Sequence, residues 1–198
     1  MRDGLWRIAC ALAAACGLAF GLWAGAGIAR AETADAIALM REGGHLLLVR
    51  HAATESGVGD PPAFRLDDCS TQRNLSEAGR GEARRLGEAL RAHGVPVAEV
   101  RSSRWCRCLD TARLAFAPQL PVAGWAPLDS LFGNRSAEPA RSRAALAALA
   151  DLPVGSNWVW VTHQANITAL TGVSVAMGEV LVARPEAGRL HVLARWRP

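Results

Sequence analysis

The order of apolar and polar positions predicts strands that alternate with helices from residue 45 onward. Continuous apolar runs bounded by turn residues predict buried strands. The predicted strands are Leu46–Arg50, Val97–Arg101 and Asn157–Val161, followed by a closing hairpin of Glu179–Ala183 and Arg189–Trp196 around a Pro-Glu-Ala-Gly turn. Strands that alternate with helices form a mostly parallel sheet with helices on both faces. The predicted fold class is therefore α/β, a three-layer sandwich.

Helices are predicted between these strands because apolar residues recur there at helical spacing. They run from an N-cap at Ser76 to His93-Gly94, from a cap at Ser102-Ser103 to a stop before Pro118, over Ala137–Leu149, and from Asn166 to Leu170. The stretch Thr54–Asn74 is polar and contains proline, which predicts a long loop after the first strand.

Residues 1–31 have the composition of a targeting segment. Arg2 and Arg7 lie near its start, Ile8–Ile28 carries no charge, and Ala29-Arg30-Ala31 offers the small residues of a cleavage site. We expect a signal peptide cleaved after Ala31, and hence a periplasmic or secreted protein. An uncleaved membrane anchor is the alternative, because the apolar run is about 20 residues long. The remaining residues 32–198 predict a single domain.

The charge of the chain gives weak grounds for a nucleic-acid partner. The net charge is +4, and it falls to +2 without residues 1–31, which hold three Arg and one Asp. No cluster of Arg interleaved with aromatic residues occurs along the chain. We therefore expect no nucleic-acid partner, and membrane contact only through an uncleaved N-terminal segment.

Three cysteines remain after residue 31, and an oxidising compartment would favour pairing of two of them. Cys106 and Cys108 are too close in sequence to pair easily with each other. A disulfide is therefore expected from Cys69 to one of these two. We find no set of four zinc ligands at suitable spacing, so no metal site is predicted.

Cationic and imidazole side chains recur where the predicted strands end. Arg50 and His51 end the first strand, Arg107 lies in the helix after the second, and His163 follows the third. Each residue alone fits a solvated turn or a satisfied structural position. Because the carboxyl ends of parallel strands meet in one crevice, the four together predict a pocket for a dianion such as phosphate.

Four segments in order resemble motifs of the histidine phosphatase superfamily, also called phosphoglycerate mutase-like, and in particular its exported small phosphatases. Leu48-Val49-Arg50-His51-Ala52 is similar to the Arg-His-Gly motif, Asn74–Ala83 to Leu-Thr-x-x-Gly-x-x-Gln-Ala, Ser102–Ala112 to Ser-Ser-x-x-x-Arg-Ala-x-x-Thr-Ala, and Val161–Ile167 to the second-histidine motif. The resemblance covers the chain from about residue 44 to its end.

The resemblance implies that His51 attacks phosphorus and becomes phosphohistidine. It further implies that Arg50, Arg107 and His163 bind the transferring phosphoryl group, with His163 as a charged donor. Fixed cations stabilise the charge on the equatorial oxygens, so neither a metal nor another cofactor is expected.

The chain departs from the family pattern at several positions. Ala52 replaces the Gly that follows the nucleophile, and Gly57 stands where many members have a phosphate-binding Asn, so Thr54 is the candidate to replace that contact. Asp129 is the nearest candidate for the proton donor. Cys108 stands where the family usually has Ala and is expected to be packed there, which favours Cys106 as the partner of Cys69.

The sequence thus predicts an exported phosphomonoesterase that acts on a small phosphorylated substrate. The resemblance to exported relatives suggests an envelope sugar phosphate as that substrate. The alternatives are a phosphoglycerate-type phosphomutase and a non-catalytic phosphate-binding module of the envelope.

Overall fold

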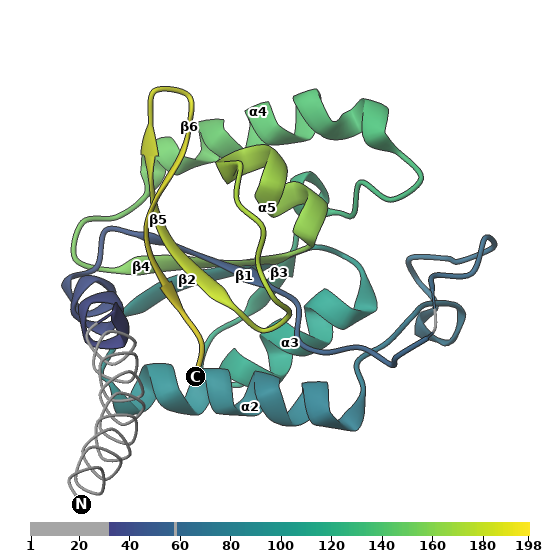
Figure 1. The fold of residues 1–198 in the computed structure, drawn as a ribbon, viewed down its shortest axis with the longest axis horizontal. Helices are drawn as coiled ribbons and strands as arrows, with labels where there is room; N and C mark the ends of the chain where they lie inside the picture. The colour runs from purple at the N-terminus through teal and green to yellow at the C-terminus, as the bar shows by residue number, and fades with distance from the viewer. Residues whose placement is uncertain (1–31, 58) are drawn as a thin grey trace, which may run out of the picture.

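A six-stranded sheet runs through the centre of the protein (Figure 1), with strand order β3-β2-β4-β1-β5-β6. The strands are β1 (Leu46–Arg50), β2 (Val97–Ser102), β3 (Val122–Gly124), β4 (Asn157–Thr162), β5 (Val180–Glu186) and β6 (Arg189–Trp196). The first four strands pair in parallel, whereas β5 and β6 are antiparallel to their neighbours. This computed structural model describes residues 32–57 and 59–198, so the predicted signal segment lies outside the described residues.

Helices cover both faces of the sheet (Figure 1). They comprise residues 32–42, α2 (Glu77–Ala92), α3 (Cys106–Phe116), α4 (Glu138–Ala148) and α5 (Gln164–Thr171), with short 3-10 turns at Cys69–Thr71, Ala126–Leu128, Arg135–Ala137 and Leu149–Asp151. Residues 32–42, α2 and α3 pack on one face, and α4 and α5 pack on the other. The predicted three-layer α/β fold is confirmed.

The burial of β1 explains its continuous apolar sequence. Side chains alternate across a strand, so Leu47 and Val49 enter the core beneath α2 and α3, while Leu46 and Leu48 enter the core beneath α5. A strand covered on both faces needs apolar residues at every position. The position of β1 in the sheet follows from this double burial.

Several element ends match the prediction closely. The helix α2 begins after Ser76, whose Oγ accepts a hydrogen bond from the backbone N of Gly79 at 3.1 Å.

The predicted hairpin turn is wrong by two residues, because Pro185 and Glu186 belong to β5 and the turn is Ala187-Gly188. Both turn residues have positive φ, as tight hairpins with two-residue loops require. The sequence pattern does not predict β3, which is too short to show a period, or the helical residues 32–42.

The start of α3 differs from the prediction. Its N-cap is Trp105, which makes no side-chain capping bond, instead of Ser102-Ser103. Ser102 still belongs to β2, and the Ser103 hydroxyl lies 2.8 Å from His163 Nε2. Ser103 therefore contacts His163 and does not cap α3.

A disulfide joins the long loop after β1 to the first residue of α3. Cys69 and Cys106 are bonded with an S–S distance of 2.04 Å, which is the pairing that the sequence favours, and Cys108 is a buried free thiol. Phe64 of the same loop packs on Trp105 with ring centroids 4.3 Å apart. The disulfide and this ring contact hold the loop against α3, the helix that carries Arg107.

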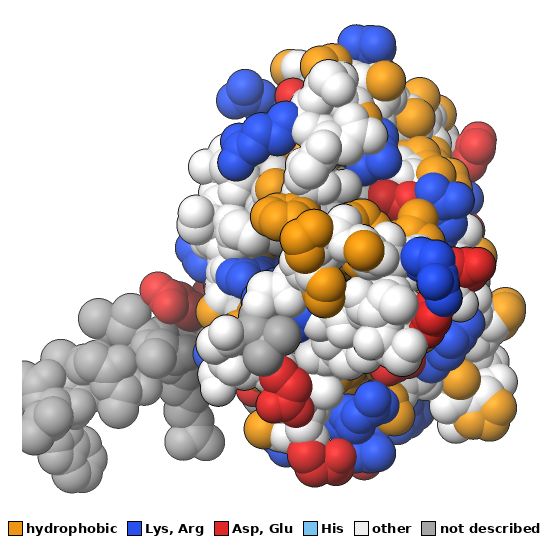
Figure 2. All heavy atoms as spheres, turned by 90° about the vertical axis from the view of Figure 1, so that its right-hand side faces the viewer, with side chains coloured by type: hydrophobic (Ala, Val, Ile, Leu, Met, Phe, Trp, Pro, Cys, Tyr) orange, Lys and Arg blue, Asp and Glu red, His pale blue; other side chains and the backbone are white. Residues whose placement is uncertain are grey.

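The surface seen from the right-hand side of Figure 1 is mixed in character. Figure 2 shows cationic, acidic and apolar side chains interspersed over this face. No helix in the described part of the chain is long and apolar enough to cross a membrane.

Reduction of the disulfide should destabilise the protein. Cys69 and Cys106 are 37 residues apart, and opening such a loop is expected to cost roughly 3 to 4 kcal/mol of unfolding free energy on the chain-entropy model. Denaturant titration with and without reductant measures the difference. The double variant Cys69→Ser, Cys106→Ser is the control, because its stability should not respond to reductant. Equal stability of the oxidised and reduced wild-type protein would contradict the prediction.

Candidate active site

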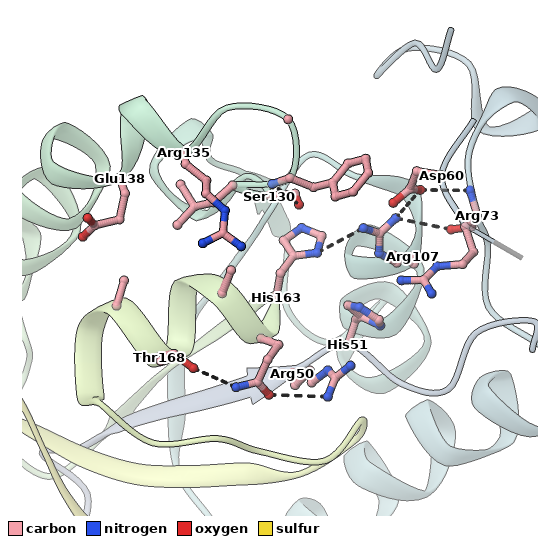
Figure 3. A pocket seen from close by; sticks show the side chains of 16 residues that line it. Arg50, His51, Asp60, Arg73, Arg107, Ser130, Arg135, Glu138, His163 and Thr168 are labelled. Carbon is pink, nitrogen blue, oxygen red and sulfur yellow. Dashed lines mark hydrogen bonds and ion pairs between the residues drawn. The ribbon is translucent and has the colours of Figure 1, made fainter. Parts of the chain in front are cut away.

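A cavity of about 960 Å³ opens where β1 and β4 end (Figure 3). The residues that line it are Arg50, His51, Asp60, Arg73, Arg107, Ser130, Leu131, Phe132, Gly133, Arg135, Glu138, His163, Gln164, Ala165, Thr168 and Ala169. Four of the predicted site residues, Arg50, His51, Arg107 and His163, therefore lie together. They come from β1, from α3 and from the turn between β4 and α5.

His51 is held in the tautomer that a nucleophile needs. Its backbone N donates to Thr162 O at 3.0 Å, and its Nδ1 lies 2.9 Å from the Ala52 carbonyl oxygen. A carbonyl only accepts hydrogen bonds, so Nδ1 carries the proton and Nε2 keeps its lone pair. Burial, together with Arg107, Arg50 and Arg73, lowers the pKa of His51 to about 3. The imidazole is therefore neutral and nucleophilic at neutral pH.

The first turn of α2 supports the backbone next to His51. A Cβ atom at Gly79 would lie 1.9 Å from the Ala53 carbonyl oxygen, so only glycine allows this approach. The Ala53 backbone N donates to Glu82 Oε2 at 3.0 Å, and the Ser76 backbone N donates to Ala53 O at 3.1 Å. The segment after the nucleophile is thereby fixed to α2.

Two arginines that line the cavity are each held by a hydrogen bond from Nη1. Arg50 Nη1 donates to Val175 O at 2.8 Å, and Arg107 Nη1 donates to Asp60 Oδ1 at 2.8 Å. The Nε atoms of Arg50 and Arg107 are buried without a hydrogen-bond partner in the described part of the chain. Burial and the nearby cations Arg73 and Arg107 lower the pKa of Arg50. An anion in the cavity would relieve the repulsion between these cations.

His163 lies opposite the nucleophile, with its ring centroid 5.5 Å from that of His51. Arg107 Nη2 donates to its Nδ1 at 3.3 Å, so Nε2 carries the proton and donates to Ser103 Oγ at 2.8 Å. Burial, followed by Arg107 and His51, lowers the pKa of His163 well below 6.5. Without a bound anion His163 is therefore neutral, and its role as a charged donor to a bound phosphoryl group stays a prediction.

The structure does not place Asp129 where a proton donor would act. The side chain is buried and does not line the cavity. Its Oδ1 accepts from the Arg104 backbone N at 2.8 Å, and its Oδ2 accepts from Arg104 Nε at 2.9 Å and Nη2 at 2.6 Å. Ser103 Oγ lies 3.5 Å from Oδ1. Asp129 thus contacts His163 only through Ser103, while the next residue, Ser130, lines the cavity.

Thr54 also lies outside the cavity lining. Its Oγ1 faces Met177 Sδ at 3.9 Å, because the chain turns toward α2 after Ala53. The loop returns to the cavity at Asp60, which accepts from Arg107 and from the Arg73 backbone N at 3.2 Å. Asp60 and Arg73 are cavity residues that sequence reasoning missed, since a loop without periodicity gives no signal of where its side chains point.

The described residues contain no group of three or more His, Cys, Asp or Glu side chains that could hold a metal ion. Burial raises the pKa of Cys108 to about 12, so this thiol beside His163 stays protonated and is a packing group. The positive charge of the cavity comes from guanidinium groups.

Fold and site together define an α/β protein with an arginine-lined cavity built around a neutral histidine. The model of the histidine phosphatase superfamily (branch 1) matches residues 46–131. The expected resemblance to this superfamily is thus confirmed over residues 46–131.

Solved structures share the fold. YhfR of Bacillus stearothermophilus has a TM-score of 0.56 and 20% identity, over 76% of this chain and 95% of that chain. The alpha-ribazole phosphatase from Shigella flexneri has a TM-score of 0.55 and 19% identity, over 76% and 95%. The protein histidine phosphatase SixA complexed with tungstate has a TM-score of 0.55 and 17% identity, over 78% and 97%. No curated protein sequence matches the chain.

His51 should remain neutral in the folded protein down to acid pH. Its pKa of about 3 lies below the ordinary 6.5, so its NMR resonances should not titrate between about pH 8 and pH 5. Between pH 6.5 and pH 3 the His51 side chain is protonated in the unfolded chain but not in the folded protein. The free energy of unfolding should therefore fall as the pH decreases below about 6.5. The spectrum of His51→Ala assigns the resonance. An inflection near pH 6.5 would contradict the geometry.

Asp129→Asn should slow the hydrolysis of all phosphate esters by a similar factor. The change weakens the support of Ser103 and His163 and leaves the leaving-group oxygen untouched, so kcat/KM should fall about tenfold, the equivalent of one hydrogen bond to a charged group. Rates with p-nitrophenyl phosphate and n-butyl phosphate measure this, and Asp151→Asn, an exposed carboxylate, is the control. A loss confined to the butyl ester would identify Asp129 as the proton donor after all.

Proposed function

We propose that this protein is a phosphatase that hydrolyses phosphate monoesters through a phosphohistidine intermediate on His51. The observation that carries the proposal is a neutral imidazole with a free Nε2 in a cavity that is also lined by Arg50, Arg73 and Arg107. A nucleophile and fixed cations aimed at one site are the two requirements of phosphoryl transfer.

In the first step the ester phosphate binds between Arg50 and Arg107. His51 Nε2 forms a bond to phosphorus while the phosphorus–oxygen bond of the ester breaks, and the electron pair leaves with the alcohol oxygen. That oxygen takes its proton from water, since Asp129 does not reach the cavity. The guanidinium groups stabilise the charge on the equatorial oxygens, which is why we propose that no metal is needed.

In the second step a water oxygen attacks phosphorus and the bond to His51 Nε2 breaks. The attacking water loses a proton to solvent, and phosphate leaves the cavity. His51 returns to its neutral form with the Nδ1 proton still donated to Ala52 O. The positive charge that His51 carries as phosphohistidine is balanced by the bound phosphoryl oxygens.

We also propose that the protein acts outside the cytoplasm, in the periplasm or after secretion. The composition of residues 1–31 supports this location, and so does the Cys69–Cys106 disulfide, because such bonds persist in oxidising compartments.

His51→Ala should abolish hydrolysis of p-nitrophenyl phosphate without unfolding the protein, because only the nucleophile is lost. Rapid acid-free quenching during turnover should trap an acid-labile phosphate on the wild type and none on the variant. His191→Ala removes an exposed imidazole on β6 and is the matched control. Wild-type protein that binds phosphate without turnover would support a non-catalytic module, and transfer of phosphate to a second alcohol in preference to water would support a mutase.

A further inference from the structure

The loop between β1 and α2 brings two charged side chains, Asp60 and Arg73, to the cavity (Figure 3). This loop has little core of its own. Among its described residues between 55 and 74, only Gln72 is buried, and neither of the two large hydrophobic cores includes a residue of the loop. A segment with few buried apolar contacts opens more easily than the rest of a fold. The position of the loop therefore depends on particular contacts with its neighbours.

Three contacts hold the loop against the beginning of α3. The disulfide joins Cys69 to Cys106, the Cys106 backbone N donates to Gln72 Oε1 at 3.0 Å, and Phe64 packs on Trp105. All three act at the N-cap or the first residue of α3. The covalent bond is the strongest of them, and the other two contacts lie within a few residues of it in the loop.

The loop in turn fixes one of the arginines of the cavity. Arg107 Nη1 donates to Asp60 Oδ1 at 2.8 Å, and the two side chains are only 3% and 5% exposed. The Arg73 backbone N donates to the same carboxylate oxygen at 3.2 Å. An arginine side chain has many rotamers, so its guanidinium group keeps one orientation only while such partners hold it. Movement of the loop would remove the buried counter-charge of Arg107.

The same movement would remove a positive charge from the cavity. Figure 3 shows the Arg73 side chain directed into the cavity between Arg107 and His51. Burial first, and then the charges of Arg107, Arg50 and Arg73, lower the pKa of His51. The charge of Arg73 therefore reaches the nucleophile, and it would attract a phosphate dianion bound there.

We propose that this loop, through Asp60 and Arg73, is part of the anion site, and that the site is complete only while Cys69 and Cys106 are joined. When the disulfide forms, the two thiols give up two electrons and two protons to a disulfide oxidant, which becomes two thiols. A dithiol reverses the exchange, and Cys69 is exposed. The reduced chain keeps both cores but loses the fixed position of the loop. The protein thus gains its activity in an oxidising compartment, an inference that rests on the proposed function.

Titration calorimetry with inorganic phosphate tests the proposal on oxidised protein and on protein reduced with dithiothreitol. The oxidised form should bind phosphate about tenfold or more tightly, as expected when reduction displaces one charged group and frees another. Far-UV circular dichroism should be the same for both forms. By thermodynamic linkage, saturating phosphate should raise the ratio of reduced to oxidised dithiothreitol needed for half reduction by the same factor.

Arg73→Gln distinguishes a loss of this ligand from a general weakening of the fold. The oxidised variant should bind phosphate less tightly than the oxidised wild type, and reduction should weaken its binding by a smaller factor, since one of the two contributions is already missing. Arg65→Gln is the matched control from the same loop, because its side chain is 64% exposed and does not line the cavity. The double variant Cys69→Ser, Cys106→Ser should bind phosphate like the reduced wild type, with or without reductant.

Equal phosphate affinities of the oxidised and reduced forms would overturn the proposal. A loss of circular dichroism on reduction would overturn it as well, since the disulfide would then stabilise the whole fold instead of the site. Equal effects of Arg65→Gln and Arg73→Gln would reject Arg73 as a ligand in favour of general attraction. If the oxidised wild type does not hydrolyse p-nitrophenyl phosphate but its phosphate binding still depends on oxidation, the proposed function alone is rejected.

Discussion

The parallel pairing of β1 with β4 is the constraint on which the site depends. Arg50 lies opposite Thr162 in this register, and the His51 backbone N continues the ladder to Thr162 O. His51 and His163 therefore lie side by side at the edge of the sheet, each one residue beyond the end of its strand. The Ser103 backbone N extends the β2–β4 ladder to Val161 O in the same way, at 2.9 Å. A slip of one residue would move a strand's side chains to the opposite face and separate these groups.

The clustering of cations that follows from this register also sets the state of the nucleophile. Burial is the main cause of the lowered pKa of His51, and the guanidinium groups of Arg107, Arg50 and Arg73 add to it, so His51 stays neutral. In the proposed mechanism, the cations that bind the phosphate dianion thus also help burial to keep the imidazole neutral. Asp60 is a counter-charge within the cavity, and its ion pair with Arg107, in which both side chains are almost fully buried, holds that guanidinium in place.

The parts of the fold and the site that could be predicted are those with a local physical signal. The double burial of β1 requires a continuous apolar run, and the Ser76 cap marks the start of α2. Because ligands bind at the carboxyl ends of parallel strands, the strand ends alone bring His51 and His163 to one place. Positions on loops have no such signal. Thr54 and Asp60 lie in the same polar stretch, and only the path of the backbone, held by Glu82 and by the disulfide, decides that Asp60 enters the cavity.

In the segment after β3, two neighbouring side chains point in different directions, and this decides which chemical group enters the cavity. A 3-10 turn over Ala126–Leu128 ends at Asp129, whose carboxylate turns inward to Arg104, while Ser130 lines the cavity. The cavity therefore receives a hydroxyl from this segment and not a carboxyl group. A hydroxyl is too weak an acid to protonate a departing alkoxide efficiently at neutral pH. The carboxylate instead accepts from Ser103, whose Oγ lies 2.8 Å from His163 Nε2. Asp129 thereby fixes the side chains of Arg104 and Ser103 from a buried position that its place in the sequence does not reveal.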